Sequence, residues 1–248
     1  MADWNDPSRN AQRFGSLPRA GGDVDGRVTF DEGLRRHMLS IYNYMTSGIL
    51  LTGIVALLAF TSGTAEAIFT GGILRWIVAL SPMAVVFAMS FGANRFSTGT
   101  LQIMFWGFSI LMGLSLSSVF LVYTGGSIAT TFFATAAAFA GLSLFGYTTK
   151  KNLSGMGSFL IMGVVGLIVA MVINLFLQSP AFHYAISFIG VLIFAGLTAY
   201  DTQRLKAEYE MLRGSQFAGK AVILGALTLY LDFINMFQFL LSLLGNRE

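Results

Sequence analysis

Seven apolar blocks follow one another along the chain, and each is close to the roughly 20 residues that a helix needs to cross a bilayer. The blocks cover residues 43–61, 73–92, 100–122, 128–147, 157–177, 184–203 and 220–244. Charged residues make up 11% of the sequence, whereas an ordinary soluble domain has about 25%. We therefore predict an all-α integral membrane protein with seven transmembrane helices in one bundle. A soluble enzyme and a nucleic-acid-binding protein are excluded.

Glycine and cysteine usage is consistent with a helical bundle in lipid. The chain contains 28 Gly, and such small residues let the backbones of membrane helices approach closely. It contains no Cys, which excludes disulfides, thiolate nucleophiles and thiolate metal ligands.

The N-terminal part of the chain is polar and charged, unlike everything after it. We predict a flexible cytoplasmic arm over residues 1–41 and a seven-helix membrane domain over residues 42–248. Apolar residues at helical spacing predict an interfacial helix near residues 30–42. The chain does not start with a basic segment followed by a short apolar run, so we expect no cleavable signal peptide.

The distribution of basic residues predicts the orientation in the membrane. With a cytoplasmic N-terminus, the seven crossings leave 13 of the 15 Lys and Arg residues on the inner side, with Arg75 and Arg247 outside. Basic residues concentrate on the cytoplasmic side of membrane proteins. We therefore expect the N-terminus inside and the C-terminus outside.

Only two acidic residues lie within the apolar blocks, Asp201 near the inner end of the sixth and Asp232 near the middle of the seventh. Carboxylates are costly in the bilayer core, so they normally face the bundle interior and mark functional sites. The two can meet only if the sixth helix tilts or extends past the inner surface. Such a pair would hold a proton between its carboxyl groups and respond to pH or to a cation. Alternatively, each Asp is a structural partner for a polar residue on another helix.

Four other polar residues are candidates for supporting the pair. Asn235 lies one turn beyond the second Asp, and Asn174, Gln203 and Arg95 could also come close. Each amide could instead form an ordinary interhelical hydrogen bond, and Arg95 could extend to the membrane surface. Two carboxylates fall short of the six to eight oxygen ligands that Ca²⁺ usually takes. The aspartates are therefore a weak metal site, and a proton-gated cation path fits them better. We expect no cofactor.

Two segments around the aspartates, AYDTQ at residues 199–203 and LYLDFINMF at residues 229–237, resemble the last two helices of the Bax inhibitor-1 family. The resemblance extends from about residue 42 to the C-terminus and indicates a bacterial-type member in the inner membrane. It implies a seven-helix fold in which six helices surround the seventh. It also implies a pH-sensitive calcium leak controlled by a di-aspartyl pair, which would be Asp201 and Asp232.

The second apolar block departs from some bacterial relatives, which carry an acidic residue in this helix and a basic cluster at its inner end. Here residues 73–92 contain no carboxylate, and only Arg95 follows them. This departure argues against an arginine latch on Asp201.

Three functions compete for this sequence. The first is a pH-sensitive cation leak channel, with the bilayer and Ca²⁺ or other cations as partners. The second is a regulatory protein that binds other membrane proteins, as some members of the resembled family do, with the aspartates structural. The third is an intramembrane aspartyl protease, but Asp232 lacks the Gly-x-Gly-Asp setting of such enzymes, and no Pro-Ala-Leu follows it. We expect the first function and no enzymatic activity.

Overall fold

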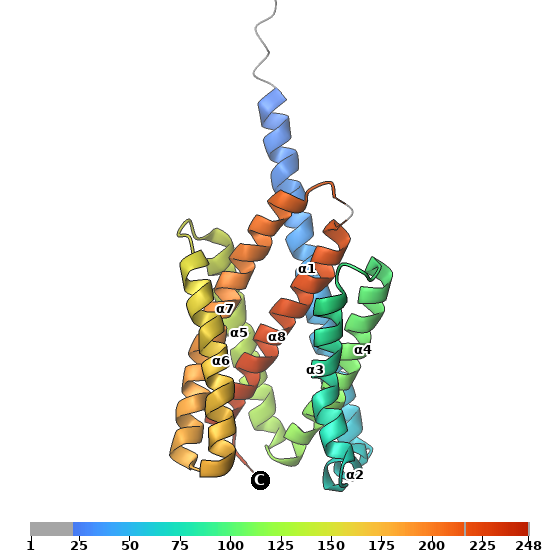
Figure 1. Ribbon diagram of the computed structural model, residues 1–248, viewed down its shortest axis with the longest axis vertical. Helices are drawn as coiled ribbons and strands as arrows, with labels where there is room; N and C mark the ends of the chain where they lie inside the picture. Colours follow the sequence, from blue (N-terminus) through green and yellow to red (C-terminus); the bar gives the residue numbers. More distant parts are fainter. Residues whose placement is uncertain (1–21, 216, 248) are drawn as a thin grey trace, which may run out of the picture.

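The computed structural model describes residues 22–215 and 217–247, with side chains from Glu32 onward (Figure 1). The helices are α1 (Gly22–Thr61), α2 (Thr64–Thr70), α3 (Leu74–Gly92), α4 (Thr98–Leu116) with a 3-10 turn η2 (Ser117–Leu121), α5 (Gly125–Thr148), α6 (Ser154–Leu177), α7 (Pro180–Leu212) and α8 (Ala218–Leu244). Within these residues seven helices, all but α2, are long and apolar enough to cross a membrane. The predicted all-α, seven-span architecture is confirmed.

The first spanning helix begins earlier than the apolar block suggested. α1 runs through residue 41 without a break, and Leu34, Met38 and Ile41 are buried at helical spacing. The segment expected as an interfacial helix therefore lies within α1, and its apolar face packs on protein. The flexible arm over residues 1–41 stays a prediction. α1 covers its residues 22–41, and residues 1–21 lie outside the described residues.

The last helix, α8, lies at the centre of the bundle, as predicted. It packs against α1, α4, α5 and α7, and 50% of its most apolar stretch is buried, compared with 11% for α3 and for α6. Figure 1 shows α8 running obliquely between two groups of helices, α5, α6 and α7 on one side and α1, α3 and α4 on the other. α3 and α6 are consequently the helices most exposed to lipid.

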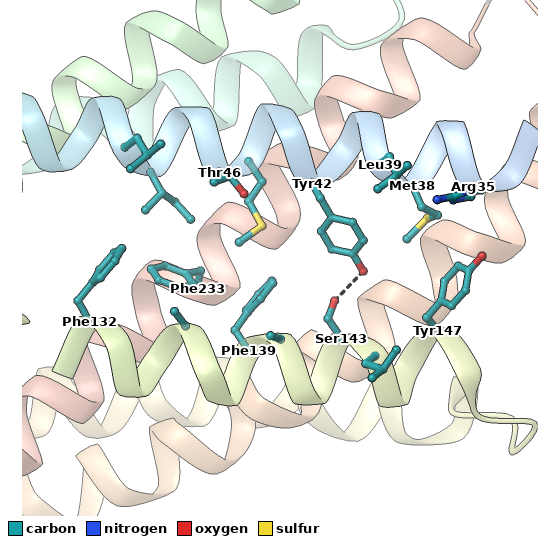
Figure 2. A pocket seen from close by; sticks show the side chains of 16 residues that line it. Arg35, Met38, Leu39, Tyr42, Thr46, Phe132, Phe139, Ser143, Tyr147 and Phe233 are labelled. Atoms are coloured by element: carbon teal, nitrogen blue, oxygen red, sulfur yellow. Dashed lines mark hydrogen bonds between the residues drawn. The ribbon is translucent and has the colours of Figure 1, made fainter. Parts of the chain in front are cut away.

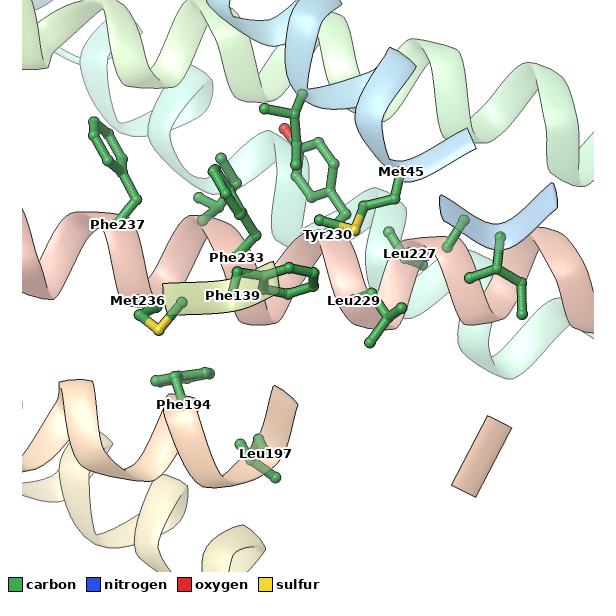
Figure 3. Packing of buried hydrophobic residues seen from close by; sticks show 14 of the residues in the cluster. Met45, Phe139, Phe194, Leu197, Leu227, Leu229, Tyr230, Phe233, Met236 and Phe237 are labelled. Carbon is green, nitrogen blue, oxygen red and sulfur yellow. The ribbon is translucent and has the colours of Figure 1, made fainter. Parts of the chain in front are cut away.

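Aromatic and aliphatic side chains of α8 form the centre of the apolar core (Figure 3). Tyr230 is fully buried, and its ring centroid lies 5.0 Å from that of Phe108 on α4. The Tyr230 hydroxyl forms a 2.6 Å hydrogen bond with the Thr52 hydroxyl of α1, which donates to the Ser109 carbonyl of α4. These bonds satisfy both buried hydroxyls and join three helices.

Most of the described basic residues lie on one face of the bundle, which we call the basic face: Arg35, Arg36, Arg95, Lys150, Lys151, Arg204, Lys206, Arg213 and Lys220. Two of them cap helix ends. Lys206 donates to the Tyr147 carbonyl of α5 at 3.0 Å, and Lys220 donates to the Ala93 carbonyl after α3 at 3.2 Å. A cation at this end of a helix satisfies free carbonyls and complements the helix dipole. The opposite face carries α2 and the C-terminus (Figure 1).

Candidate functional site

Asp201 and Asp232 lie at similar depths in the bundle because α7 extends beyond the apolar block at residues 184–203. The block ended at residue 203, whereas the helix continues to Leu212. Asp201 is thus 11 residues from the end of α7, about 17 Å along its axis. Asp232 is 14 residues from the start of α8, about 21 Å along its axis. Since α7 and α8 are consecutive and pack against each other, the two aspartates come together.

Glycines on two neighbouring helices hold the part of α7 that precedes Asp201. A Cβ atom at Gly146 of α5 would lie within 3.0 Å of three backbone atoms of Ala199. One at Gly157 of α6 would lie within 2.8 Å of three ring carbons of Tyr200. Real Cβ atoms essentially never approach other atoms below 3.0 Å. At Gly146, where the obstructing atoms are backbone, only Gly allows the helices to pack so closely, and at Gly157 a larger residue would displace the Tyr200 ring.

The carboxyl groups of Asp201 and Asp232 are close enough to interact directly with each other. Both side chains are buried, at 5% and 4% exposure. Apart from this mutual contact, Oδ1 of Asp201 and Oδ2 of Asp232 have no hydrogen-bond partner within the described part of the chain. Unsatisfied buried acceptors are uncommon in folded proteins, so a site with two of them is a candidate for function.

Arg204 supplies a positive charge beside the pair, one turn along α7. Its Nη2 atom lies 3.1 Å from Oδ1 of Asp201, in an ion pair whose geometry does not make a hydrogen bond. The guanidinium group also lies over the ring of Tyr200, 5.9 Å from the centroid. We did not assign Arg204 to the site from sequence, although its i, i+3 spacing from Asp201 was a usable signal. Arg95, which we did assign, is exposed after α3 and forms no ion pair with a described residue.

The three amides expected near the pair form hydrogen bonds elsewhere. Asn235 donates to the Leu231 carbonyl of its own helix at 2.8 Å. Asn174 accepts from the Ser179 amide at the C-terminal end of α6. Gln203 bridges the α5–α6 connection, accepting from one backbone amide and donating to one carbonyl at 2.8 Å each. Within the described part of the chain, none of the three forms a hydrogen bond to either aspartate. Their supporting role stays a prediction.

A chain of hydroxyl groups connects α1, α5 and α7 next to the pair. Thr202 donates to the Thr198 carbonyl at 2.8 Å and accepts from Ser143 at 2.8 Å. Ser143 in turn accepts from Tyr42 at 2.7 Å. We did not predict this chain, because hydroxyl residues are common in membrane helices and nothing in their spacing connects these three.

The weak metal site expected at Asp201 and Asp232 stays a prediction, because the pair alone supplies few ligands. Within the described residues, no three His, Asp or Glu side chains converge as metal ligands. Arg204 also brings a positive charge to 3.1 Å from Asp201, and Ca²⁺ usually takes six to eight oxygen ligands. A calcium ion at this place would be an ion in transit, and that role stays a prediction.

Comparison with known proteins covers nearly the whole chain. The family model described as Inhibitor of apoptosis-promoting Bax1 matches residues 34–248. The inner membrane protein YbhL of Escherichia coli strain K12 is 44% identical over 235 residues, which cover 94% of this chain and 99% of that protein. An uncharacterized protein of Caulobacter vibrioides is 45% identical over 258 residues, covering 98% of this chain and 100% of its own. A similar protein of Rickettsia prowazekii is 45% identical over 225 residues, covering 89% and 93%.

Proposed function

The chain belongs to the Bax inhibitor-1 family of membrane proteins, and from this premise we propose that it is a pH-sensitive leak channel for Ca²⁺ or another cation, gated by Asp201 and Asp232. The observation that carries the proposal is the contact between two buried carboxyl groups, one of them on the central helix α8. Ionisable groups inside a membrane are costly to keep and characteristically serve ion pathways and proton relays.

The charges at the pair support a proton-dependent gate. With one shared proton, the two carboxyl groups carry a single negative charge, which Arg204 balances at 3.1 Å. If this proton leaves, two buried carboxylates face each other and repel. If a second proton binds, Arg204 loses the anion that it pairs with. Either change alters the contact between α7 and α8.

The position of α8 explains how such a change would spread. α8 packs against α1, α4, α5 and α7, so a shift of α8 relative to α7 disturbs packing on all its sides. Packed helix interfaces tend to switch between discrete arrangements, which amplifies a small local change. The carboxylate oxygens without other partners would then meet a cation that enters the bundle.

We also propose that the basic face lies in the cytoplasm. This face carries most of the described Lys and Arg residues, and basic residues concentrate on the cytoplasmic side of membrane proteins. YbhL is named an inner membrane protein, and a bacterial inner membrane is the location that we propose here. The N-terminus would then be inside and the C-terminus outside.

Cation flux into proteoliposomes tests the proposal. Ca²⁺ uptake by the purified full-length chain is measured from pH 5 to 8 for the wild type, Asp201→Asn and Asp232→Asn. Glu210→Gln is the matched control, because it removes an exposed carboxylate from the same helix as Asp201. Asn keeps the size and hydrogen bonding of Asp but cannot ionise, so both Asn variants should hold the flux at one value across the range. The control should keep the wild-type profile, and wild-type profiles in both Asn variants would refute the gate.

An interaction protein with structural aspartates is the second candidate. The description of the matching family model names an action on another protein. In this case the folded wild type would give no Ca²⁺ flux above empty liposomes, and the Asn variants would lose thermal stability or partner capture. We assign no catalytic step to the pair. Cleavage of a model transmembrane substrate that both Asn variants lose would instead support an intramembrane protease.

A further inference from the structure

A long groove separates α1 from α5 on the outside of the bundle (Figure 2). Its volume is about 740 Å³, within the roughly 300–1,000 Å³ of typical ligand sites. Phe233 of α8 forms part of the floor, and Met38, Ile49 and Phe139 are among the apolar side chains that line it. Neither Asp lines it, although Tyr42 and Ser143 of the hydroxyl chain beside the pair do.

The groove opens to lipid rather than to water. Leu39, Leu50 and Leu144 line it and are 48%, 57% and 63% exposed. All three belong to stretches that span the membrane. An apolar hollow in this position is in contact with the hydrocarbon of the bilayer, so its natural occupant is an apolar chain.

One end of the groove is positively charged. Figure 2 shows Arg35 of α1 and Tyr147 of α5 at the same end, with Phe132 at the other. The Nζ atom of Lys206 lies 5.1 Å from the centroid of the Tyr147 ring. Arg35 has no ion pair within the described part of the chain, whereas its neighbour Arg36 is paired with the side chain one turn before it. Among the side chains that the structure describes, no Asp or Glu lines the groove, so the charge at this end is available to an anion.

We propose that this groove binds an anionic phospholipid from the leaflet at the basic face. Its phosphate would pair with Arg35, whose planar guanidinium matches phosphate geometry, and one acyl chain would lie along the apolar walls toward Phe132. Anionic headgroups are attracted to basic residues at the membrane surface. The groove combines this charge at the membrane surface, which suits the headgroup, with an apolar part that continues inward and suits an acyl chain.

The width of the groove favours an acyl chain over a helix of a second copy. A hydrogen bond of 2.7 Å between Tyr42 of α1 and Ser143 of α5 crosses it, as Figure 2 shows. Because this bond connects α1 and α5, the space between the two helices is too narrow for a further helix about 10 Å across. A single acyl chain is much thinner and can pass beside this bridge.

Native mass spectrometry of the full-length chain in detergent tests the proposal. The protein is titrated with phosphatidylglycerol and with phosphatidylcholine of the same acyl chains. We expect one phosphatidylglycerol to bind more tightly than phosphatidylcholine. Arg35→Gln should weaken phosphatidylglycerol binding about fivefold, the effect of one basic residue near an anionic headgroup. Arg36→Gln is the matched control, because it removes the adjacent charge, which does not line the groove, and should leave binding unchanged.

A second pair of variants tests the acyl chain independently of the charge. Ala140 lines the groove, so Ala140→Phe should narrow it and weaken binding of both lipids. Ala137 is exposed on the same helix outside the groove, and Ala137→Phe should bind as the wild type does. All four substituted positions are exposed, and thermal unfolding verifies that each variant is folded. Equal binding of the two lipids by the wild type would overturn the proposal. Equal losses of lipid binding in a variant and its control would also overturn it. Dimers of the wild type that Ala140→Phe abolishes would overturn it too, because a second copy of the chain would then occupy the groove.

Discussion

Replacing Gly146 with Ala should force α5 away from α7 next to Asp201. The new Cβ atom would lie within 3.0 Å of three backbone atoms of Ala199, including its carbonyl carbon at 2.9 Å. Non-bonded carbon atoms pack best at about 3.5–4.0 Å, so this contact is at least about 0.6 Å too short. The obstructing atoms belong to a helix backbone and cannot rotate away. The two helices must therefore separate.

The expected loss is about 1–3 kcal/mol in the free energy of unfolding, the usual cost of overpacking a well-packed core. The better helix propensity of Ala offsets at most about 1 kcal/mol of this loss. Gly141 on the same helix provides the matched control, because a Cβ atom there would meet nothing within 4 Å. Gly141→Ala should therefore be neutral or slightly stabilising.

Thermal unfolding of the two variants and the wild type in the same detergent measures this difference. The unfolding midpoint of Gly146→Ala should fall by several degrees, while that of Gly141→Ala should not fall. The flux assay adds a second readout, because a displaced Asp201 should change the pH profile of Gly146→Ala alone. A wild-type midpoint for Gly146→Ala, or an equal decrease in both variants, would refute the reasoning.

Two further predictions concern polar contacts of the helices that hold the pair. Arg204→Gln removes the cation that favours the ionised form of Asp201, so the midpoint of the pH-dependent flux should move to higher pH. Arg95→Gln should leave that midpoint in place, and equal shifts in both would contradict the assignment of Arg204. Tyr230→Phe removes the hydroxyl bonded to Thr52 at 2.6 Å and should lower stability by about 1 kcal/mol in denaturant titrations. Unchanged stability would mean that this buried hydrogen bond contributes nothing.

The lengths of most spanning helices could be predicted from hydropathy, but the end of α7 could not. Residues 204–212 read RLKAEYEML, and their charges ended the apolar block at residue 203. Charge marks where a helix leaves the hydrocarbon, and a helix can continue past that point in water. The extra turns place Asp201 well inside the length of α7, at a depth that matches Asp232.

The arginine beside the aspartate pair shows a second limit of prediction from sequence. Arg95 was assigned because it follows the second block, yet the ion pair with Asp201 is formed by Arg204. Spacing along one helix predicts which residues share its face, whereas contacts between helices depend on their rotation and tilt. The hydroxyl chain from Tyr42 to Thr202 depends on three helices at once, and no local pattern could have predicted it.

The amino-acid sequence was sufficient for the number of spans, the all-α class and the choice of two aspartates. These follow from local costs, because each backbone group and each carboxylate in lipid must be satisfied wherever it occurs. The contact between Asp201 and Asp232, the charge of Arg204 beside them and the groove between α1 and α5 required the packed bundle. They depend on helix depth, rotation and separation, which side chains such as Gly146 set only when helices distant in the chain meet.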